Sequence, residues 1–332
     1  MIRRLPIPLA VLLALILILV IPVQAHVPVS ADNNHDLSTA LSIEHPQKSY
    51  AIYGNLHDAG GAAYYELRMQ PGDRLVLSLM NNGYGKPAPD MIVMGPEIPL
   101  VQAAISPTVT IPNGYGAILI PGHQPLRAEY EPFSPGVISE VANYSQEITS
   151  AGTWYVAVVS PADETQYSLA VGYREEFSPL EWAIVPVSLI ETHLREGPFI
   201  LEILAPLIAV VILGFILIGR RVQRQGKKPG IAFWMASVAG LLYLGGAAMT
   251  FVQMLHAVNI TGYTPGIIIT LLFVLVPAIL GLSALRIARQ LGPWTRRHRI
   301  YLLIIGITGL IFWAGMVLGP VLAVIAALVP DR

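Results

Sequence analysis

The chain has 332 residues, of which 54% are hydrophobic and only 12% are charged, and its formal net charge is −1. Charged residues make up about 25% of an ordinary soluble protein, so this composition points to a membrane protein. The near-neutral charge gives no bulk attraction to nucleic acid. The absence of cysteine excludes disulfides, thiolate catalysis, and metal sites with cysteine ligands.

The first 25 residues have the pattern of an export signal. Met1–Arg4 is basic, Leu9–Ile21 is an unbroken apolar run, and Val23-Gln24-Ala25 resembles a signal-peptidase site. We expect a signal peptide over residues 1–25. The alternative is an uncleaved anchor, since Leu5–Val23 is almost long enough to span a bilayer. In either case the segment that follows Ala25 is expected on the outer, extracytoplasmic side of the membrane.

Residues 26–175 are predicted to form an exported β domain, because short alternating runs follow one another between turn residues. The predicted strands are Tyr50–Tyr53, Ala63–Gln70, Arg74–Met80, Met91–Met94, Tyr115–Ile120, Gln146–Thr149, Thr153–Ser160 and Gln166–Tyr173. This spacing favours an antiparallel β-sandwich or jelly roll. The predicted core residues are Tyr65, Leu67, Leu75, Leu77, Leu79, Ile92, Trp154, Val156, Val158, Tyr167, Leu169 and Val171.

Five segments of this domain carry an ordered set of motifs. They are Tyr64–Leu67, Pro71–Leu75, Asp90–Pro96, Ala151–Val158 and Tyr167–Val171. In this order the domain resembles the bacterial and archaeal pre-peptidase C-terminal (PPC-like) β-sandwich, an accessory domain of secreted proteins. The whole chain also resembles archaeal membrane proteins of this layout whose function is uncharacterised. The resemblance implies binding or structural support rather than catalysis. The Pro- and Gly-rich insertion Glu97–Ile138 departs from it.

Residues 176–197 are expected to connect the β domain to the membrane. Leu180–Leu194 is too short and too polar to span a bilayer, and it contains Trp182. It fits an interfacial helix with Trp182 at headgroup level.

Residues 198–332 are predicted to form a membrane domain of four helices. The expected spans are about 199–219, 231–255, 265–288 and 300–329, each with enough apolar residues for ~30 Å of hydrocarbon. Lys and Arg are concentrated in the first and third connections and absent from the second, 256–264. The positive-inside rule therefore places the β domain, the second connection and the C-terminus outside a multi-pass plasma-membrane protein.

Two ionisable residues lie within the predicted spans near their outer ends. Glu202 and His256 could together bind a metal or relay a proton, because intramembrane charge is costly and often functional. The alternative is that both side chains reach the headgroup region and have no joint role.

A signal cleavage after Ala25 would place His26 at the mature N-terminus. Its α-amine and imidazole would then form a bidentate copper(II) site, completed by His57 or His123, in a copper-brace-like arrangement. Met91 and Met94 could favour copper(I). The alternative is that these histidines are ordinary surface residues. Calcium is the second metal considered, and Asp58, Asp73, Asp90 and Asp163 near turns are its candidate ligands.

The predicted loops, which are rich in Gly and Pro, also contain aromatic residues: Tyr84, Tyr115, Tyr130, Phe133 and Tyr144. They could bind a sugar or a protein, or they could fix the loops to the body of the domain. Asn143 begins a glycosylation sequon. The favoured function is a non-catalytic, membrane-anchored module that binds an extracellular ligand or a membrane protein partner. An exported copper protein is the alternative, and a transporter or channel component is the third.

Overall fold

The computed structural model describes residues 26–81, 87–99, 105–174, 176, 178, 181, 200–226, 229–290 and 294–329. The predicted signal peptide and most of the predicted interfacial helix lie outside these residues. The chain divides into two compact units. The sandwich unit contains His26–Pro206 and Ala248–Val274, and the helix unit contains Leu207–Ala247 and Leu275–Arg332.

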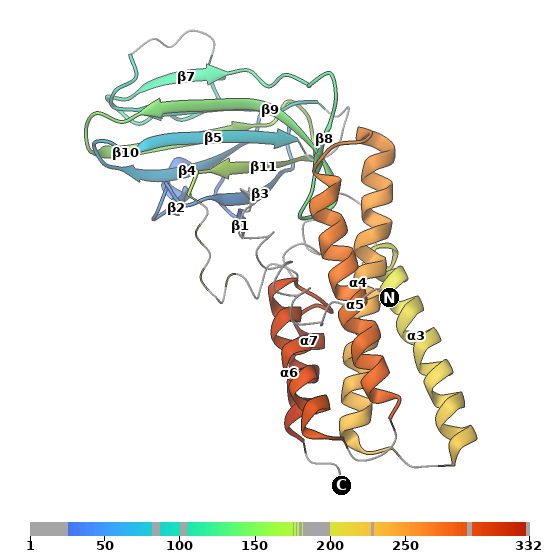
Figure 1. Cartoon of the computed structure of the whole chain (residues 1–332). Coiled ribbons are helices and arrows are strands. Elements are labelled where there is room, and N and C mark those ends of the chain that lie inside the picture. Colours follow the sequence, from blue (N-terminus) through green and yellow to red (C-terminus); the bar gives the residue numbers. More distant parts are fainter. Residues whose placement is uncertain are drawn as a thin grey trace. The chain divides into compact units, whose positions relative to one another are not determined.

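Two β-sheets make up most of the sandwich unit (Figure 1). The six-stranded sheet has the order β1-β3-β11-β5-β9-β8, and the five-stranded sheet has the order β2-β4-β10-β6-β7. The strands are β1 Val27–Ser30, β2 Leu41–Ile43, β3 Tyr50–Leu56, β4 Ala62–Met69, β5 Arg74–Asn81, β6 Asp90–Gly95, β7 Gly116–Ile120, β8 Glu129–Glu131, β9 Gly136–Glu147, β10 Gly152–Val159 and β11 Thr165–Val171. The pairings are antiparallel except β1 with β3 and β2 with β4.

A single core lies between the two sheets, and the alternation of side chains along the strands explains its composition. All twelve predicted core residues are buried, and eleven of them belong to this core. Ile92 instead faces the opposite side of the second sheet. The hydroxyls of Tyr65 and Tyr167 lie 2.6 Å apart and satisfy each other inside the core. Because a buried hydroxyl without a partner is costly, this pair fixes how the two sheets face each other.

The Pro- and Gly-rich insertion covers the outer face of the five-stranded sheet. Ile105, Val109 and Ile111 pack there against a second cluster that includes Tyr64 and Ile92. The backbone N–H of Thr110 donates to the Tyr64 hydroxyl at 2.9 Å. The central strands of this sheet are therefore buried on both faces, which explains their continuous apolar sequence.

The prediction of strands is wrong at four places. β1, β2 and β8 were not predicted, and the predicted strand Gln146–Thr149 is only the end of the 12-residue strand β9. β1, β2 and β8 are three or four residues long, too short for a period of two to be visible. β9 contains a register shift opposite Leu79 and Met80, which interrupts its alternation.

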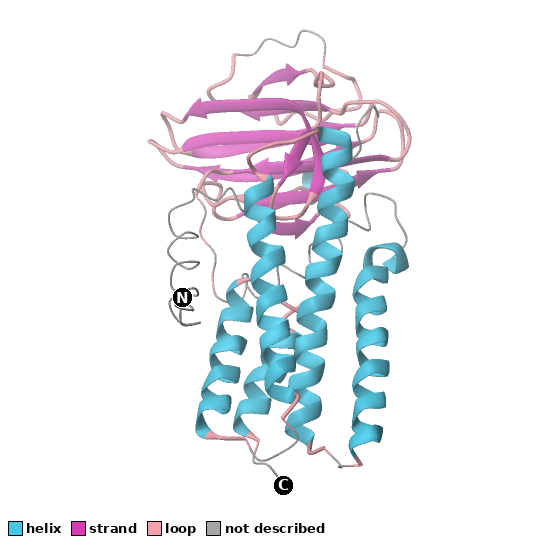
Figure 2. Cartoon of the chain, turned by 45° about the vertical axis from the view of Figure 1, so that its right-hand side comes forward, coloured by secondary structure: helices cyan, strands magenta, loops and turns pink. Residues whose placement is uncertain are grey.

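Three helices are long and apolar enough to cross a membrane: α3 Ile200–Gln225, α4 Ile231–Thr261 and α5 Ile267–Ala288. They agree with the first three predicted spans. The helices are cyan and the strands magenta in Figure 2. A membrane-protein assignment follows from these helices.

The predicted fourth span, 300–329, is not one helix. α6 Arg296–Ile311 and α7 Leu318–Leu328 are separate, and Trp313, Gly315, Met316 and Val317 between them all have positive φ. The Arg299 guanidinium near the start of α6 donates to the carbonyls of Ala327, at 3.0 Å, and Val329, at 2.5 Å, at the end of α7. The two helices are therefore antiparallel, and the chain returns to the end from which α6 began. Residues 300–329 therefore form no continuous helix for the predicted fourth crossing, the one expected to place the C-terminus outside.

Candidate functional site

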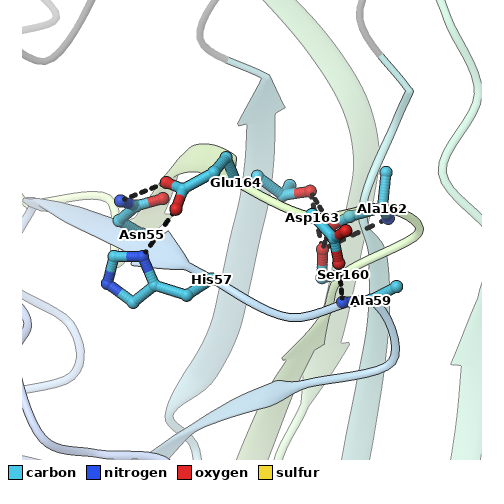
Figure 3. Close-up of polar contacts among 8 residues, drawn as sticks. Asn55, His57, Ala59, Ser160, Ala162, Asp163 and Glu164 are labelled. Atoms are coloured by element: carbon cyan, nitrogen blue, oxygen red, sulfur yellow. Dashed lines mark hydrogen bonds and ion pairs between the residues drawn. The ribbon is translucent and has the colours of Figure 1, made fainter.

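Two loops at one end of the sandwich are joined by hydrogen bonds, and Figure 3 shows those that involve side chains. One follows β3 and the other follows β10. Gly60 N–H donates to Ser160 O, and Ser160 N–H donates to Gly61 O, both at 2.9 Å. The Ala59 N–H donates to the Asp163 carboxylate at 2.9 Å. These contacts hold the two loops as one surface, which we call the loop pair and define as His57–Gly61 with Ser160–Glu164.

Glu164 organises the polar side chains of the loop pair. Its carboxylate lies 3.2 Å from His57 Nδ1 and accepts a hydrogen bond from Asn55 Nδ2 at 3.4 Å. These two contacts, that of His57 being the larger, lower the pKa of Glu164. Glu164 has φ 54°, a conformation uncommon for a residue other than glycine. Backbone strain at such a residue is often found at binding sites, so the loop pair is the candidate functional surface.

The polar side chains of the loop pair differ in exposure and in contacts. His57 and Glu164 are both exposed, while the Ser160 hydroxyl contacts Thr165 and the Ala162 carbonyl. His57 and Glu164 are therefore directed toward solvent, where they can form hydrogen bonds or ion pairs with a bound group. The nearby serine is engaged in the turn and is not placed next to His57 as a nucleophile would be.

The structure separates two of the predicted copper ligands, His26 and His57. His26 precedes β1, is partly buried, and its Nδ1 lies 2.5 Å from Ser49 Oγ, just before β3. His57 follows the opposite end of β3, about 26 Å away along the strand. His123 is exposed after β7, and its N–H donates to Val141 O at 2.9 Å. His26 would therefore need a second imidazole other than that of His57 in this conformation.

The other candidate metal ligands have local roles. Met91 and Met94 are fully buried on opposite faces of β6. Asp73 accepts the Gln70 N–H at 2.7 Å, and Asp90 accepts the Gly122 N–H at 2.8 Å. Among the described residues, no group of three or more His, Asp or Glu side chains is arranged to hold a metal ion.

Most of the described loop aromatics contact neighbouring elements. Tyr115 packs edge-to-face on Tyr155 at 6.0 Å. Tyr144, expected in a loop, lies instead on β9, and its hydroxyl contacts Gln146 of the same strand. Tyr84 lies outside the described residues. Tyr130 and Phe133 contact the membrane helices, as detailed below. These contacts favour the alternative that the aromatic residues hold the loops in place, rather than the alternative that they bind a sugar or a protein.

A second feature of the sandwich unit is the contact between the β8–β9 hairpin and the facing ends of α4 and α5. Tyr130 is buried in a cluster with Met254, Ala257 and Ile267. Its hydroxyl lies 2.6 Å from Thr270 Oγ1, which donates to Pro132 O at 2.6 Å. Phe133 packs edge-to-face on Phe273 at 5.8 Å. We call this contact the docking site.

The length of α4 explains how the docking site can lie beyond the lipid. Its 31 residues extend over about 46 Å, whereas the hydrocarbon core is ~30 Å thick. Met254 and Ala257 belong to its last two turns, and Thr270 to the first turn of α5. The contact also places the uncharged second connection beside the sandwich.

Glu131 lies at the docking site, and its pKa is shifted strongly from the usual value. Its carboxylate accepts the Phe133 N–H at 3.0 Å. Burial is the largest influence on Glu131 and raises its pKa to about 7. The backbone hydrogen bonds from Phe133 and Ser134 lower the pKa, but their effect is smaller. The folded state therefore binds a proton that the unfolded state releases between about pH 4.5 and pH 7.

We expect the sandwich to become less stable as the pH rises from about 4.5 to 7, and Glu131→Gln to remove this component. Its size is at most about 3.5 kcal/mol, since one pKa unit corresponds to about 1.4 kcal/mol. Burial lowers the pKa of His26, which gives a component of opposite sign. The measurement is therefore the difference in unfolding free energy between Glu131→Gln and the parent across this pH range. A difference that does not change with pH would contradict the assignment.

Two further predicted residues are placed without a joint role. Glu202 and His256 are both exposed, and no hydrogen bond or ion pair joins them within the part of the chain that the structure describes. Asn143 has an exposed side chain on β9 that donates to Glu140 at 2.7 Å. The sequon is therefore accessible, while the Glu202–His256 pair stays a prediction.

Sequence reasoning missed the docking site and Glu131. The signal available was Thr270, a polar residue in an otherwise apolar segment, but its partner 140 residues away could not be identified from spacing. No family model matches the chain, and the comparison with curated proteins finds no match. The similarity to the pre-peptidase C-terminal domain therefore rests on the quoted motifs alone.

Proposed function

We propose that this chain is a membrane-anchored binding module whose β-sandwich lies outside the cytoplasm and has no catalytic role. The loop pair is its binding surface, and α3, α4 and α5 are its anchor. The export-type N-terminus and the distribution of Lys and Arg support this location.

The docking site is the observation that carries the proposal. A sandwich attached only by a flexible connector would need no buried contact with the helices. Here Tyr130 and Thr270 share a buried hydrogen bond at 2.6 Å, and Phe133 packs on Phe273. This contact joins the sandwich to the facing ends of α4 and α5, in addition to its covalent connection through the chain.

The loop pair defines the chemistry of the partner. Asp58, Asp163 and Glu164 are carboxylates and His57 is an imidazole, all from two joined loops. Such a surface suits a partner that presents basic groups or hydrogen-bond donors. The exposed side chains of the loop pair would lie at the rim of such an interface, so we expect them to influence the association rate and its salt dependence most.

The lack of cysteine in the sequence makes the proposed location directly testable. Leu126→Cys places a thiol at a 97% exposed position of the sandwich, and Gln223→Cys places one in the basic end of α3. We expect an impermeant maleimide to label intact cells at position 126, and at position 223 only after permeabilisation. The reverse pattern would overturn the location.

Binding is tested by a photo-crosslinking residue at Asp58, with Pro71 as the matched position. Both are exposed, and Pro71 lies at the opposite end of β4, about 30 Å away. A partner that crosslinks from position 58 in intact membranes and not from position 71 supports the proposal. Equal crosslinking from both positions, or none from position 58, would contradict it.

Copper binding and transport remain alternatives with their own tests. Copper requires a mature chain that begins at His26 and about one copper per chain in the purified protein. Transport requires ion flux in liposomes. The separation of His26 from His57 gives the copper alternative no structural support, and no described contact favours transport over anchoring.

A further inference from the structure

The helix unit contains a pocket of about 170 Å³ between α3, α4 and the end of α5. Its walls are mainly apolar and include Leu217 of α3, Leu241 of α4 and Leu285 of α5. Gly214 allows the close approach of α3 and α4, because a Cβ there would lie 2.1 Å from Leu241 Cδ2. The packing of α3 against α4 therefore shapes the pocket.

Two arginines from different helices line the same pocket. Arg221 belongs to the last turns of α3, and Arg289 directly follows α5. No Asp or Glu is among the lining residues, and within the described part of the chain no carboxylate forms an ion pair with either arginine. The pocket therefore has two positive charges that its own lining does not neutralise, which is the arrangement expected for binding an anion.

Ser237 provides an independent indication of a ligand. It lines the pocket from α4, is 1% exposed, and its hydroxyl has no hydrogen-bond partner in the described structure. A serine within a helix usually satisfies its hydroxyl with the carbonyl one turn earlier. A buried hydroxyl without a partner is costly unless a bound group supplies one.

We propose that this pocket binds the phosphate of an anionic membrane lipid. Arg221 and Arg289 contact the phosphate oxygens, the Ser237 hydroxyl donates a further hydrogen bond, and the apolar walls contact the start of the acyl or alkyl chain. A lipid fits better than free phosphate for two reasons. Most of the pocket wall is apolar, and only 6% of the most apolar segment of α3 is fully buried.

The test is native mass spectrometry of the detergent-solubilised full chain, titrated with phosphatidylglycerol and separately with phosphatidylcholine. The pocket variant is Arg221→Gln with Arg289→Gln. The matched control is Arg220→Gln with Arg224→Gln, which removes the same charge from exposed positions outside the pocket lining. We expect the pocket variant to bind phosphatidylglycerol at least about tenfold more weakly and the control less than about threefold more weakly.

Ser237→Ala distinguishes ligand binding from a structural defect. Removal of an unpaired buried hydroxyl should leave the lipid-free protein as stable as the parent or more stable. Its affinity for phosphatidylglycerol should nevertheless fall several-fold. A loss of lipid-free stability in this variant would contradict the proposed role of the hydroxyl.

Three results would overturn the proposal. The first is an equal loss of affinity in the pocket variant and the control, which indicates general charge attraction. The second is equal binding of phosphatidylcholine and phosphatidylglycerol. The third is complete displacement of phosphatidylglycerol by inorganic phosphate, which identifies a site for the free anion.

Discussion

Trp154→Ala is expected to destabilise the sandwich by about 3–5 kcal/mol, the largest effect of any single substitution considered. Trp154, the third of the 8 residues of β10, is fully buried and is among the largest side chains of the core between the sheets. Gly95 on the neighbouring strand lies directly against its ring, since a Cβ there would come within 2.4 Å. The site is shaped around the indole, so the cavity left by alanine cannot close without movement of the strands.

Hydrogen exchange of the full chain in membranes measures this effect, because backbone amides of β4 and β6 pair with β10 and should lose protection. Leu126→Ala, at a 97% exposed position, is the control and should leave exchange unchanged. Trp154→Phe should cost less, since the indole Nε1 has no hydrogen-bond partner in the described structure. An alanine variant with protection equal to that of the parent would contradict the assigned core.

Thr270→Val is expected to release the β8–β9 hairpin from the membrane helices while leaving both folded. The substitution keeps the shape of the side chain but leaves the Tyr130 hydroxyl and the Pro132 carbonyl without their partner. Each unsatisfied buried group costs about 1–3 kcal/mol. Exchange at β8 and the start of β9 should therefore become at least about tenfold faster, with little change at β4 and β10.

Two substitutions make this result specific to the docking site. Thr270→Ser retains the hydroxyl and should retain most of the protection. Ser283→Ala removes a hydroxyl from the same helix that bonds only within the helix, to Ile279 O at 2.7 Å, and should have no effect on the hairpin. Faster exchange in Ser283→Ala, or none in Thr270→Val, would show that the contact is not what holds the hairpin.

The two sheets could be predicted because their strands obey simple periods. Leu75, Leu77 and Leu79 alternate along β5, and Trp154, Val156 and Val158 alternate along β10. These side chains enter one core, and the Gly and Pro turns between the runs separate the strands. The same patterning did not predict β8, since its three residues owe their conformation to β9 and the docking site.

The division of the last apolar segment into α6 and α7 could not be predicted from hydropathy. Residues 300–329 are apolar throughout, and hydropathy does not distinguish one crossing from two shorter helices. The break depends on backbone conformation at Trp313, Gly315, Met316 and Val317, and on the guanidinium of Arg299 reaching the end of α7. Of these residues only Gly315 favours positive φ by itself, so tertiary contacts determine the rest.

The candidate sites could not be predicted from the sequence, because each is formed by residues that are far apart along the chain. The loop pair joins residues about 100 positions apart, and the pocket collects side chains from three helices. His57 and Asp163 were identified individually as candidate ligands, but their partners Glu164 and Ala59 were not. Without an alignment of related chains, residue types alone do not show which distant positions meet.

The most direct test of the account is a disulfide across the docking site. A Cβ at Gly266 would lie 3.5 Å from the Cβ of Pro132, within the separation that disulfides adopt. In this cysteine-free chain, Pro132→Cys with Gly266→Cys should form an intramolecular disulfide in membranes, detected as linked tryptic peptides before reduction. Leu126→Cys with Gly266→Cys is the control pair and should remain reduced. Linked peptides only in the first pair are the predicted result. Reduced thiols in both pairs, or equal linkage in both, would contradict a sandwich fixed on α4 and α5.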